Sequence, residues 1–109
     1  YVANYCPLAF FDGGRNVTPD KLPAAEMALV IRACDAHLRT LVETMRPDWV
    51  IGVGAYAQAQ AERALTVCAH QPHIGRVLHP SPASPAANRG WAEAATQQLT
   101  EQGVWPPTP

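Results

Sequence analysis

Apolar residues recur at steps of three and four between positions 27 and 45, where they form one stripe along a predicted helix. The members of this stripe are Met27, Val30, Ile31, Cys34, Leu38, Leu41, Val42 and Met45. Leu22-Pro23 comes before the stripe, and Pro47 stands just beyond it, where proline cannot continue a helix. The pattern therefore predicts one long amphipathic helix between these two prolines.

Two short apolar runs predict buried strands. Residues 49–54 form a continuous apolar run between breakers, which is typical of a parallel strand that is covered on both faces. Residues 74–78 form a second run, which ends at His79. The alanine-rich stretch 55–69 lies between the runs and predicts a second helix.

Both ends of the chain add an element to this pattern. Residues 1–11 are apolar and aromatic but are broken by an asparagine and a proline, which predicts an irregular strand and then a turn over residues 12–16. Near the other end, Asn88 is a favourable N-cap for a last helix, and Gly103 is suited to close that helix.

The alternation of strands and helices predicts an α/β fold with three α/β/α layers and a central parallel sheet. With 109 residues, the chain has room for one domain, expected over residues 1–105 with a proline-rich tail over 106–109. Sites in such sheets form at the carboxyl ends of the strands, and His79 stands at such an end.

Composition narrows the class of protein. A hydrophobic fraction of 48% with 16% charged residues indicates a globular chain, and no apolar run approaches the roughly 20 residues of a membrane helix. Cys6, Cys34 and Cys68 are widely spaced and form no CxxC pair, which argues against a zinc or iron–sulfur site. We expect three reduced, mostly buried thiols in an intracellular protein, without metal or cofactor.

The charge balance is uneven along the chain. The net charge of −1 is unusual for a nucleic-acid binder. However, the stretch 63–91 contains three arginines and three histidines and no acid. This local positive balance is suited to a phosphate backbone, but chance clustering on a solvated face explains it as well.

The stretch 79–85, His-Pro-Ser-Pro-Ala-Ser-Pro, is the most specific feature of the sequence. Its three prolines fix the backbone, so the loop is stiff before any ligand binds. A stiff loop that begins with an imidazole is suited to place a hydrogen-bond donor. Alternatively, the prolines merely end a strand and His79 binds a backbone carbonyl, and the residues alone leave both readings open.

Gly52-Val53-Gly54 with Ala57 fits the dinucleotide-binding pattern G-x-G-x-x-G/A between a strand and a helix. The acid expected about 20 residues further on is missing. A tight strand-to-helix turn explains the same glycines. A nucleotide-binding half-domain therefore stays an alternative hypothesis.

Several motifs together resemble one enzyme family. His79-Pro80-Ser81-Pro82, followed by Pro85, Asn88 and Gly90-Trp91, resembles the C-terminal active-site motif of single-strand-selective monofunctional uracil-DNA glycosylases. Asn4-Tyr5-Cys6-Pro7-Leu8 resembles the uracil-recognition segment of that family. Gly13-Gly14-Arg15-Asn16 and Val53-Gly54 also occur in the family's order. The resemblance covers nearly the whole chain.

The resemblance implies a DNA-repair glycosylase with a uracil-DNA glycosylase-like fold. Such an enzyme flips out uracil, or oxidised uracil derivatives, and removes the base by hydrolysis. Single- and double-stranded DNA would be its partners, and we expect a monomer without membrane association or cofactor. The protein would be nuclear in a eukaryote and cytoplasmic in a bacterium. A non-catalytic DNA-binding remnant of the fold is the alternative.

The resemblance also assigns roles to single residues. His79 would donate a hydrogen bond to the uracil carbonyl oxygen that collects negative charge as the base leaves. Asn4 would read the uracil edge, because its amide offers an acceptor and a donor side by side. The DNA contacts would come from Gly14, Arg15, Pro80, Ser81, Pro82, Ala83, Ser84, Pro85, Asn88 and Arg89.

Two departures from the family pattern stand out. A basic residue is expected after the second proline of the His79 motif, but Ala83 occupies that position, while Arg89 is retained. In addition, the family's first motif, with the asparagine that positions water, precedes the recognition segment around Asn4. We therefore expect this chain to be the C-terminal part of such an enzyme and to be inactive alone.

Overall fold

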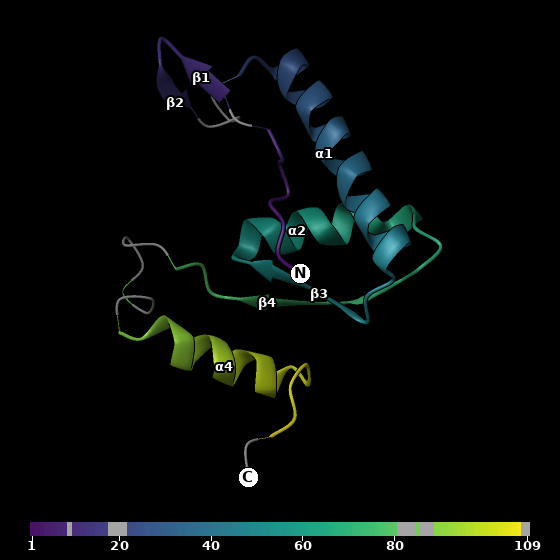
Figure 1. The fold of residues 1–109 in the computed structure, drawn as a ribbon, viewed down its shortest axis with the longest axis vertical. Helices are drawn as coiled ribbons and strands as arrows, with labels where there is room; N and C mark the ends of the chain where they lie inside the picture. Colours follow the sequence, from purple (N-terminus) through teal and green to yellow (C-terminus); the bar gives the residue numbers. More distant parts are fainter. Residues whose placement is uncertain (9, 18–21, 81–84, 86–88, 108–109) are drawn as a thin grey trace.

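The computed structural model describes residues 1–8, 10–17, 22–80, 85 and 89–107. The elements follow one another as β1 (Phe10–Asp12), β2 (Arg15–Val17), α1 (Ala24–Met45), β3 (Trp49–Val53), α2 (Ala55–Ala64), the short 3₁₀ helix η2 (Leu65–Val67), β4 (His73–Val77) and α4 (Trp91–Glu101) (Figure 1). The α/β class predicted from the sequence is confirmed.

Strands β3 and β4 pair in parallel, with Trp49 opposite His73 and Val53 opposite Val77. The backbone N–H of Gly54 extends the pairing by donating to the carbonyl of Val77 at 2.8 Å. The two predicted parallel strands are thus confirmed in place, with β4 starting and ending one residue earlier than expected. Their predicted burial is only partly confirmed, because β3 is mostly half-buried and Val53 is 42% exposed. Their carboxyl ends lie side by side, so the loops after them start at the same edge of the sheet.

Helices α1 and α2 pack on one face of this sheet and form its core (Figure 1). Val42 on α1, Ala61 on α2 and Leu65 on η2 are at most 3% exposed. Partly buried residues from the helices, the strands and the following loop surround them, namely Leu38, Val50, Cys68 and Ile74. Two members of the apolar stripe read from the sequence, Leu38 and Val42, therefore belong to this core, whereas Met45 at the end of the stripe is 48% exposed.

Helix α4 lies on the other side of the sheet and is fastened to the outer edge of β4 by two glutamines (Figure 1). The Gln102 side chain accepts from Arg76 N–H at 2.8 Å and donates to Arg76 C=O at 2.6 Å. Gln98 accepts from Leu78 N–H at 2.9 Å. These amide groups take the place of a neighbouring strand at the carboxyl end of this edge, where they pair the N–H and C=O of Arg76 and the N–H of Leu78.

The limits of α1 follow from its flanking residues. Pro23 stands at the N-cap with extended backbone, and its carbonyl accepts the N–H of Met27 at 2.9 Å. At the other end, Arg46 turns into the left-handed region with φ 48°, and its N–H closes on the carbonyl of Val42. Pro47 then prevents a further turn. The predicted helix is confirmed at both ends.

Three expectations need correction. Residues 1–8 form no strand, because Asn4 and Pro7 interrupt any regular pairing, and the strand begins only at β1. The predicted turn over 12–16 is a tight turn at Gly13-Gly14 inside an antiparallel hairpin of β1 and β2. The N-cap of α4 is Gly90 rather than Asn88, which lies outside the described residues.

The chain is more open than a compact domain of its size. Its radius of gyration is 15.7 Å, against about 13 Å for a compact domain of 100 residues. The hairpin stands beyond the N-terminal end of α1, away from the sheet (Figure 1). Beside β3, whose outer edge has no strand partner among the described residues, a groove is lined by apolar side chains of α1, β3 and the N-terminal segment.

Within the described ranges, none of the helices combines the length and the apolar character that a membrane span requires.

Candidate functional site

His79 stands two residues beyond the end of β4 and is exposed to solvent. Its side chain lies directly over Gly54, the residue that connects β3 to α2. A Cβ atom at position 54 would come within 3.3 Å of the His79 Cβ. Gly54 also has φ +94°, a conformation that other residues rarely adopt. Glycine at this position therefore lets the imidazole lie against the N-terminal end of α2.

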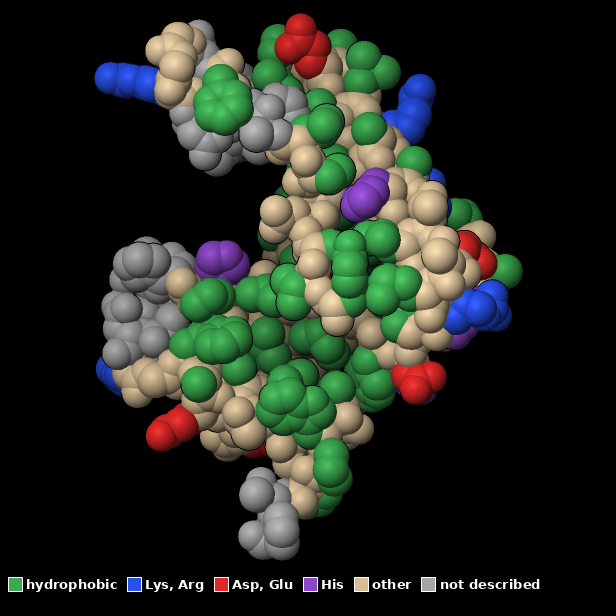
Figure 2. Space-filling view, viewed as in Figure 1, with side chains coloured by type: hydrophobic (Ala, Val, Ile, Leu, Met, Phe, Trp, Pro, Cys, Tyr) green, Lys and Arg blue, Asp and Glu red, His purple; other side chains and the backbone are tan. Residues whose placement is uncertain are grey.

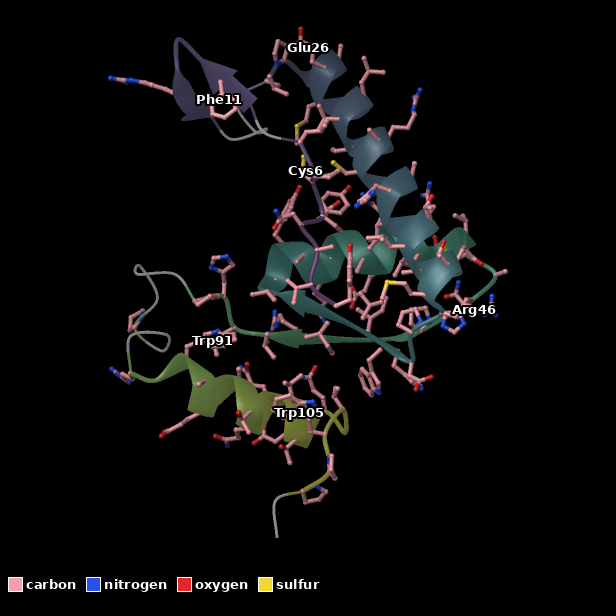
Figure 3. All side chains as sticks on the ribbon, viewed as in Figure 1. Cys6, Phe11, Glu26, Arg46, Trp91 and Trp105 are labelled. Atoms are coloured by element: carbon pink, nitrogen blue, oxygen red, sulfur yellow. The ribbon has the colours of Figure 1, made fainter. Side chains whose placement is uncertain are left out.

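The residue before His79 is held from two sides. The indole N–H of Trp91 donates to the Leu78 carbonyl at 2.6 Å, and Gln98 accepts from the Leu78 N–H at 2.9 Å. Figure 3 shows Trp91 at the start of α4, beneath the carboxyl end of β4. The backbone that carries His79 is thus fixed although its side chain is exposed.

Asn4 lies in the irregular N-terminal segment and is exposed. The following residue, Tyr5, is half-buried, and its ring meets that of Tyr56 edge to face with centroids 6.2 Å apart. Tyr56 belongs to the first turn of α2. The backbone at Asn4 is therefore tied to the same end of α2 that His79 covers.

The two residues that the sequence singled out are thus both linked to the first turn of α2, His79 directly and Asn4 through its neighbour Tyr5. Gly54, which contacts His79, and Tyr56, which contacts the neighbour of Asn4, are two residues apart in the chain. This place is the carboxyl end of β3, where parallel sheets form their sites. The N-terminal end of a helix also favours negative charge nearby.

Beneath Asn4 lies a polar network that the sequence analysis missed. The carboxylate of Asp35 on α1 is 5% exposed and accepts two hydrogen bonds from the Arg63 guanidinium, at 2.7 and 2.8 Å. The Tyr5 hydroxyl donates to the same carboxylate. The Arg63 guanidinium holds the pKa of Asp35 below its usual range, while burial and then Asp35 itself raise the pKa of Tyr5.

A signal for this network was present in the sequence. Position 35 falls eight residues after Met27, inside the apolar stripe of α1, where the spacing calls for a hydrophobic residue. An acid at such a place needs a buried cationic or hydrogen-bonding partner. The sequence alone did not identify that partner, because Arg63 and Tyr5 are 28 and 30 residues away.

The other predicted DNA contacts are not all at this place. Gly14 and Arg15 are exposed on the hairpin, which is separate from the sheet edge at His79 (Figure 1). Pro80, Pro85 and Arg89 are exposed. The predicted contacts that lie outside the described residues are Ser81, Pro82, Ala83, Ser84 and Asn88.

On the one face of the molecule that Figure 2 draws, the local positive charge of residues 63–91 forms no patch. Arg63 is neutralised by Asp35, with which it forms a salt bridge at 2.7 Å. On the face drawn in Figure 2, Lys and Arg side chains lie scattered around the margin, while hydrophobic side chains gather near β3 and α4. The charge pattern by itself therefore does not locate a DNA-binding surface.

The three cysteines are free thiols, as predicted, but only Cys34 is buried. Burial and the neighbouring Cys6 thiol raise the pKa of Cys34 to about 12. Among the described residues, no three His, Cys, Asp or Glu side chains are grouped as a metal site would require. Cys34 is therefore a protonated core residue at neutral pH.

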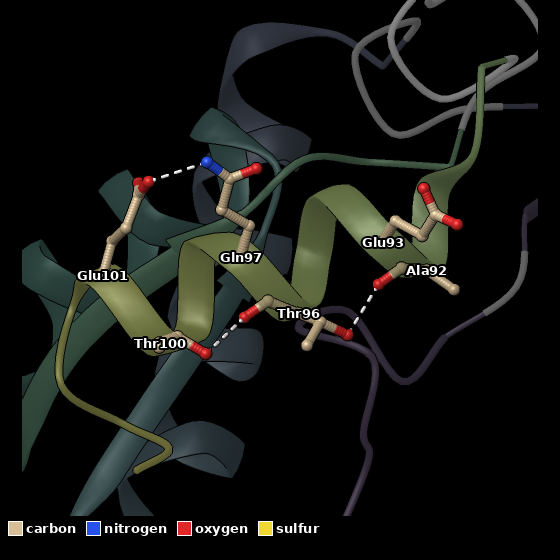
Figure 4. A pocket seen from close by; sticks show the side chains of 6 residues that line it. All are labelled: Ala92, Glu93, Thr96, Gln97, Thr100 and Glu101. Atoms are coloured by element: carbon tan, nitrogen blue, oxygen red, sulfur yellow. Dashed lines mark hydrogen bonds between the residues drawn. The ribbon is translucent and has the colours of Figure 1, made fainter. Parts of the chain in front are cut away.

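A hollow on the outer face of α4 carries no candidate chemistry. It is lined only by residues of that helix, Ala92, Glu93, Thr96, Gln97, Thr100 and Glu101 (Figure 4). The hydroxyls of both threonines donate to carbonyls one turn earlier, and the Gln97 amide donates to Glu101. These polar groups already have partners within the helix.

The glycines that suggested nucleotide binding have packing reasons. A Cβ atom at Gly52 would collide with the backbone of Gln58 on α2. The Gly54 N–H, which a phosphate would need, donates instead to Val77. These contacts favour the tight strand-to-helix turn over a phosphate-binding loop.

Comparison with known proteins agrees with the resemblance read from the motifs. No family model matches the chain. A single-strand selective monofunctional uracil-DNA glycosylase from Rattus norvegicus is 42% identical over 107 residues, which is 97% of this chain. The proteins of the same name from Bos taurus and Mus musculus are 40% and 41% identical over the same share of the chain. The chain spans only 38–39% of the length of these relatives. Over almost its whole length, the chain is thus a relative of the single-strand selective monofunctional uracil-DNA glycosylases.

Proposed function

We propose that this chain forms the base-reading and leaving-group side of a uracil-DNA glycosylase of base-excision repair. The observation that supports the proposal is that His79 lies against Gly54 at the start of α2 and that Tyr5, the neighbour of Asn4, contacts Tyr56 in the same turn. The chain is also 40–42% identical to such enzymes. The whole enzyme would have a three-layer uracil-DNA glycosylase-like fold, of which residues 1–105 form one part and 106–109 a tail.

His79 would stabilise the leaving base. When the bond between uracil and deoxyribose breaks, negative charge collects on a carbonyl oxygen of the base, and a donor fixed at that oxygen lowers the barrier. The Leu78 backbone is held by Trp91 and Gln98, so the imidazole after it starts from a fixed place. The N-terminal end of α2 beneath it favours the same negative charge.

Asn4 would select the base. Uracil offers an N3–H donor next to the O4 acceptor, whereas cytosine offers an acceptor next to a donor. An amide held in one orientation can accept from the uracil N3–H and donate to the uracil O4, and this arrangement does not fit cytosine. An exposed amide whose backbone neighbour is anchored suits this role, because a flipped-out base approaches from solvent.

The stretch 80–89 would contact single- and double-stranded DNA and enter the space that the flipped base leaves. Ala83 in place of a basic residue would weaken its hold on a duplex. Gly14 and Arg15 on the hairpin would contact the backbone further along. We further propose that the enzyme acts as a monomer inside the cell, in the nucleus if eukaryotic, without a membrane or a cofactor.

The group that positions the attacking water would come from the part of the relatives' length that this chain does not span. The apolar groove beside β3 and the unpaired outer edge of that strand, among the described residues, support this proposal. A strand and apolar residues from another part of the protein would cover both.

The test is excision of uracil from a single-stranded oligonucleotide by the protein in its full natural length. His79→Ala should slow single-turnover cleavage by roughly 10²–10³-fold, as the loss of one such donor does elsewhere. Binding should weaken far less. The matched control is His73→Ala, at the amino end of the same strand, which should cleave at nearly the unchanged rate.

Unchanged cleavage by His79→Ala would remove His79 from the mechanism. Binding without any cleavage by the unmutated, full-length protein would instead identify it as the non-catalytic DNA-binding remnant.

A further inference from the structure

The polar network under the N-terminal segment joins three parts of the chain. Asp35 contributes both carboxylate oxygens from α1, Arg63 contributes two nitrogens from α2, and Tyr5 contributes its hydroxyl from the segment. The Arg63 guanidinium also donates a hydrogen bond to the Tyr5 hydroxyl oxygen at 3.1 Å, so each of the three side chains contacts the other two. The three side chains therefore form one unit.

The Asp35–Arg63 pair is held in place by contacts that do not involve the N-terminal segment. Gln60, one turn before Arg63 on α2, accepts from the guanidinium at 2.7 and 3.2 Å and so fixes its orientation. A planar guanidinium that meets a carboxylate through two parallel bonds has little rotational freedom. Asp35 is 5% exposed, so solvent does not compete for its oxygens.

The protonation states are also defined. The Arg63 guanidinium lowers the pKa of Asp35, which stays a carboxylate at neutral pH. Burial raises the pKa of Tyr5, which stays a phenol. The Tyr5 O–H is consequently the donor and Asp35 the acceptor over the whole physiological range.

The segment has few other anchors. Residues 1–8 contain no regular secondary structure, and Tyr1 and Val2 are 88% and 93% exposed, with Leu8 at 53%. Tyr5 and Cys6 are its half-buried residues. Figure 3 shows Cys6 on the trace that runs between the hairpin and α2, beside α1. The Cys6 thiol neighbours Cys34 on α1, so the ring and hydroxyl of Tyr5 and the thiol of Cys6 together link this segment to the helices.

We propose that Tyr5, Asp35 and Arg63 are positioning residues that set the place and direction of the Asn4 amide. This inference rests on the proposed role of Asn4 in reading the base. Because Asn4 and Tyr5 share a peptide bond, anchoring the Tyr5 side chain limits where the Asn4 backbone can lie. None of the three touches the base itself.

The variant that isolates this role is Tyr5→Phe, which keeps the ring and its contact with Tyr56 but removes the hydroxyl. The matched control is Tyr1→Phe, which makes the same chemical change in the same segment at an 88% exposed position. Both are made in the protein in its full natural length. Asn4→Ala is measured beside them as the reference for loss of base reading.

For Tyr5→Phe we expect a roughly tenfold rise in KM for uracil in single-stranded DNA, with kcat lowered by less than about threefold. A hydrogen bond to a charged group is strong enough for an effect of this size. Preference for uracil over cytosine should fall in parallel. Tyr1→Phe should change none of these.

The outcomes separate the two proposals. If Asn4→Ala loses selectivity but Tyr5→Phe behaves like Tyr1→Phe in both KM and selectivity, the positioning role is wrong and the function of Asn4 stands. If Asn4→Ala keeps full selectivity, the base-reading role of Asn4 is wrong, and the positioning proposal fails with it. A loss of kcat alone in Tyr5→Phe, in step with lost folded protein, would show a merely structural role and overturn the inference.

Discussion

The glutamines of α4 offer a sharp test of what holds the sheet together. Replacing Gln98 and Gln102 together by methionine removes the amide donors and acceptors but keeps an unbranched side chain of similar length. Methionine also has nearly the same helix propensity as glutamine. Any loss of stability then reports the missing hydrogen bonds rather than a change in packing or in the helix.

Four hydrogen bonds are lost in this double variant. They are the pair between Gln102 and the Arg76 backbone, the bond from Leu78 N–H to Gln98, and the bond from the Gln102 amide to the Gln98 carbonyl. Each contributes about 0.5–1.5 kcal/mol net, which gives about 2–6 kcal/mol in total. Water can reach the exposed groups of Arg76 and Gln102, so we expect the lower half, about 2–4 kcal/mol. Small domains have only about 5–15 kcal/mol in all, so this loss is large.

The assay is urea unfolding of the chain followed by far-UV circular dichroism. The matched control is Gln97→Met on the same helix, where the amide is exposed and donates only to Glu101. That variant should stay within about 0.5 kcal/mol of the unmutated chain. The double variant should also scatter more light on concentration, because a bare strand edge invites pairing between molecules.

Equal urea midpoints for the double variant and the Gln97→Met control would refute this reasoning. The edge of β4 would then be satisfied by water, and α4 would be held by its apolar contacts alone.

Two further predictions follow from the ion pair and from the length of the chain. Arg63 lowers the pKa of Asp35 in the folded state, so the pair contributes its full stability above about pH 4 and loses it as the pH falls further. The urea midpoint should therefore fall less between pH 5 and pH 2.5 in Asp35→Asn than in the unmutated chain. An equal fall of the midpoint in both proteins would contradict this prediction. The 109-residue chain alone should release uracil from single-stranded DNA far more slowly than the protein in its full natural length. Adding the remaining part as a separate piece should restore the rate of release. Rapid, His79-dependent release by the chain alone would contradict the proposal.

The regular elements could be predicted because each leaves a local pattern. The stripe of α1 and its flanking prolines define that helix almost to the residue, and the apolar run before Gly54 defines β3. Irregular parts leave no such pattern. The segment around Asn4 reads as apolar and strand-like, but its conformation depends on a hydroxyl contact with residue 35.

The candidate site was predictable in its residues but not in its support. His79 and Asn4 were found from motifs, because a proline-rich loop and a short recognition segment are each continuous stretches of the sequence. Tyr5 was visible only as part of the motif, and Arg63 only as a positive charge. Their roles depend on contacts across 28 to 58 residues of chain, which no local spacing reveals.

The glutamine side chains on the outer edge of β4 leave the β3–β4 sheet with one edge that can accept a further strand. With Gln98 and Gln102 occupying that edge, an added strand has β3 as the open place to pair among the described residues. If the part proposed to cover β3 is made as a separate piece, the two pieces would therefore rejoin in this sheet at the β3 edge. Such a pair is the starting point for a split reporter, in which recovery of uracil release signals that two fused partners have met.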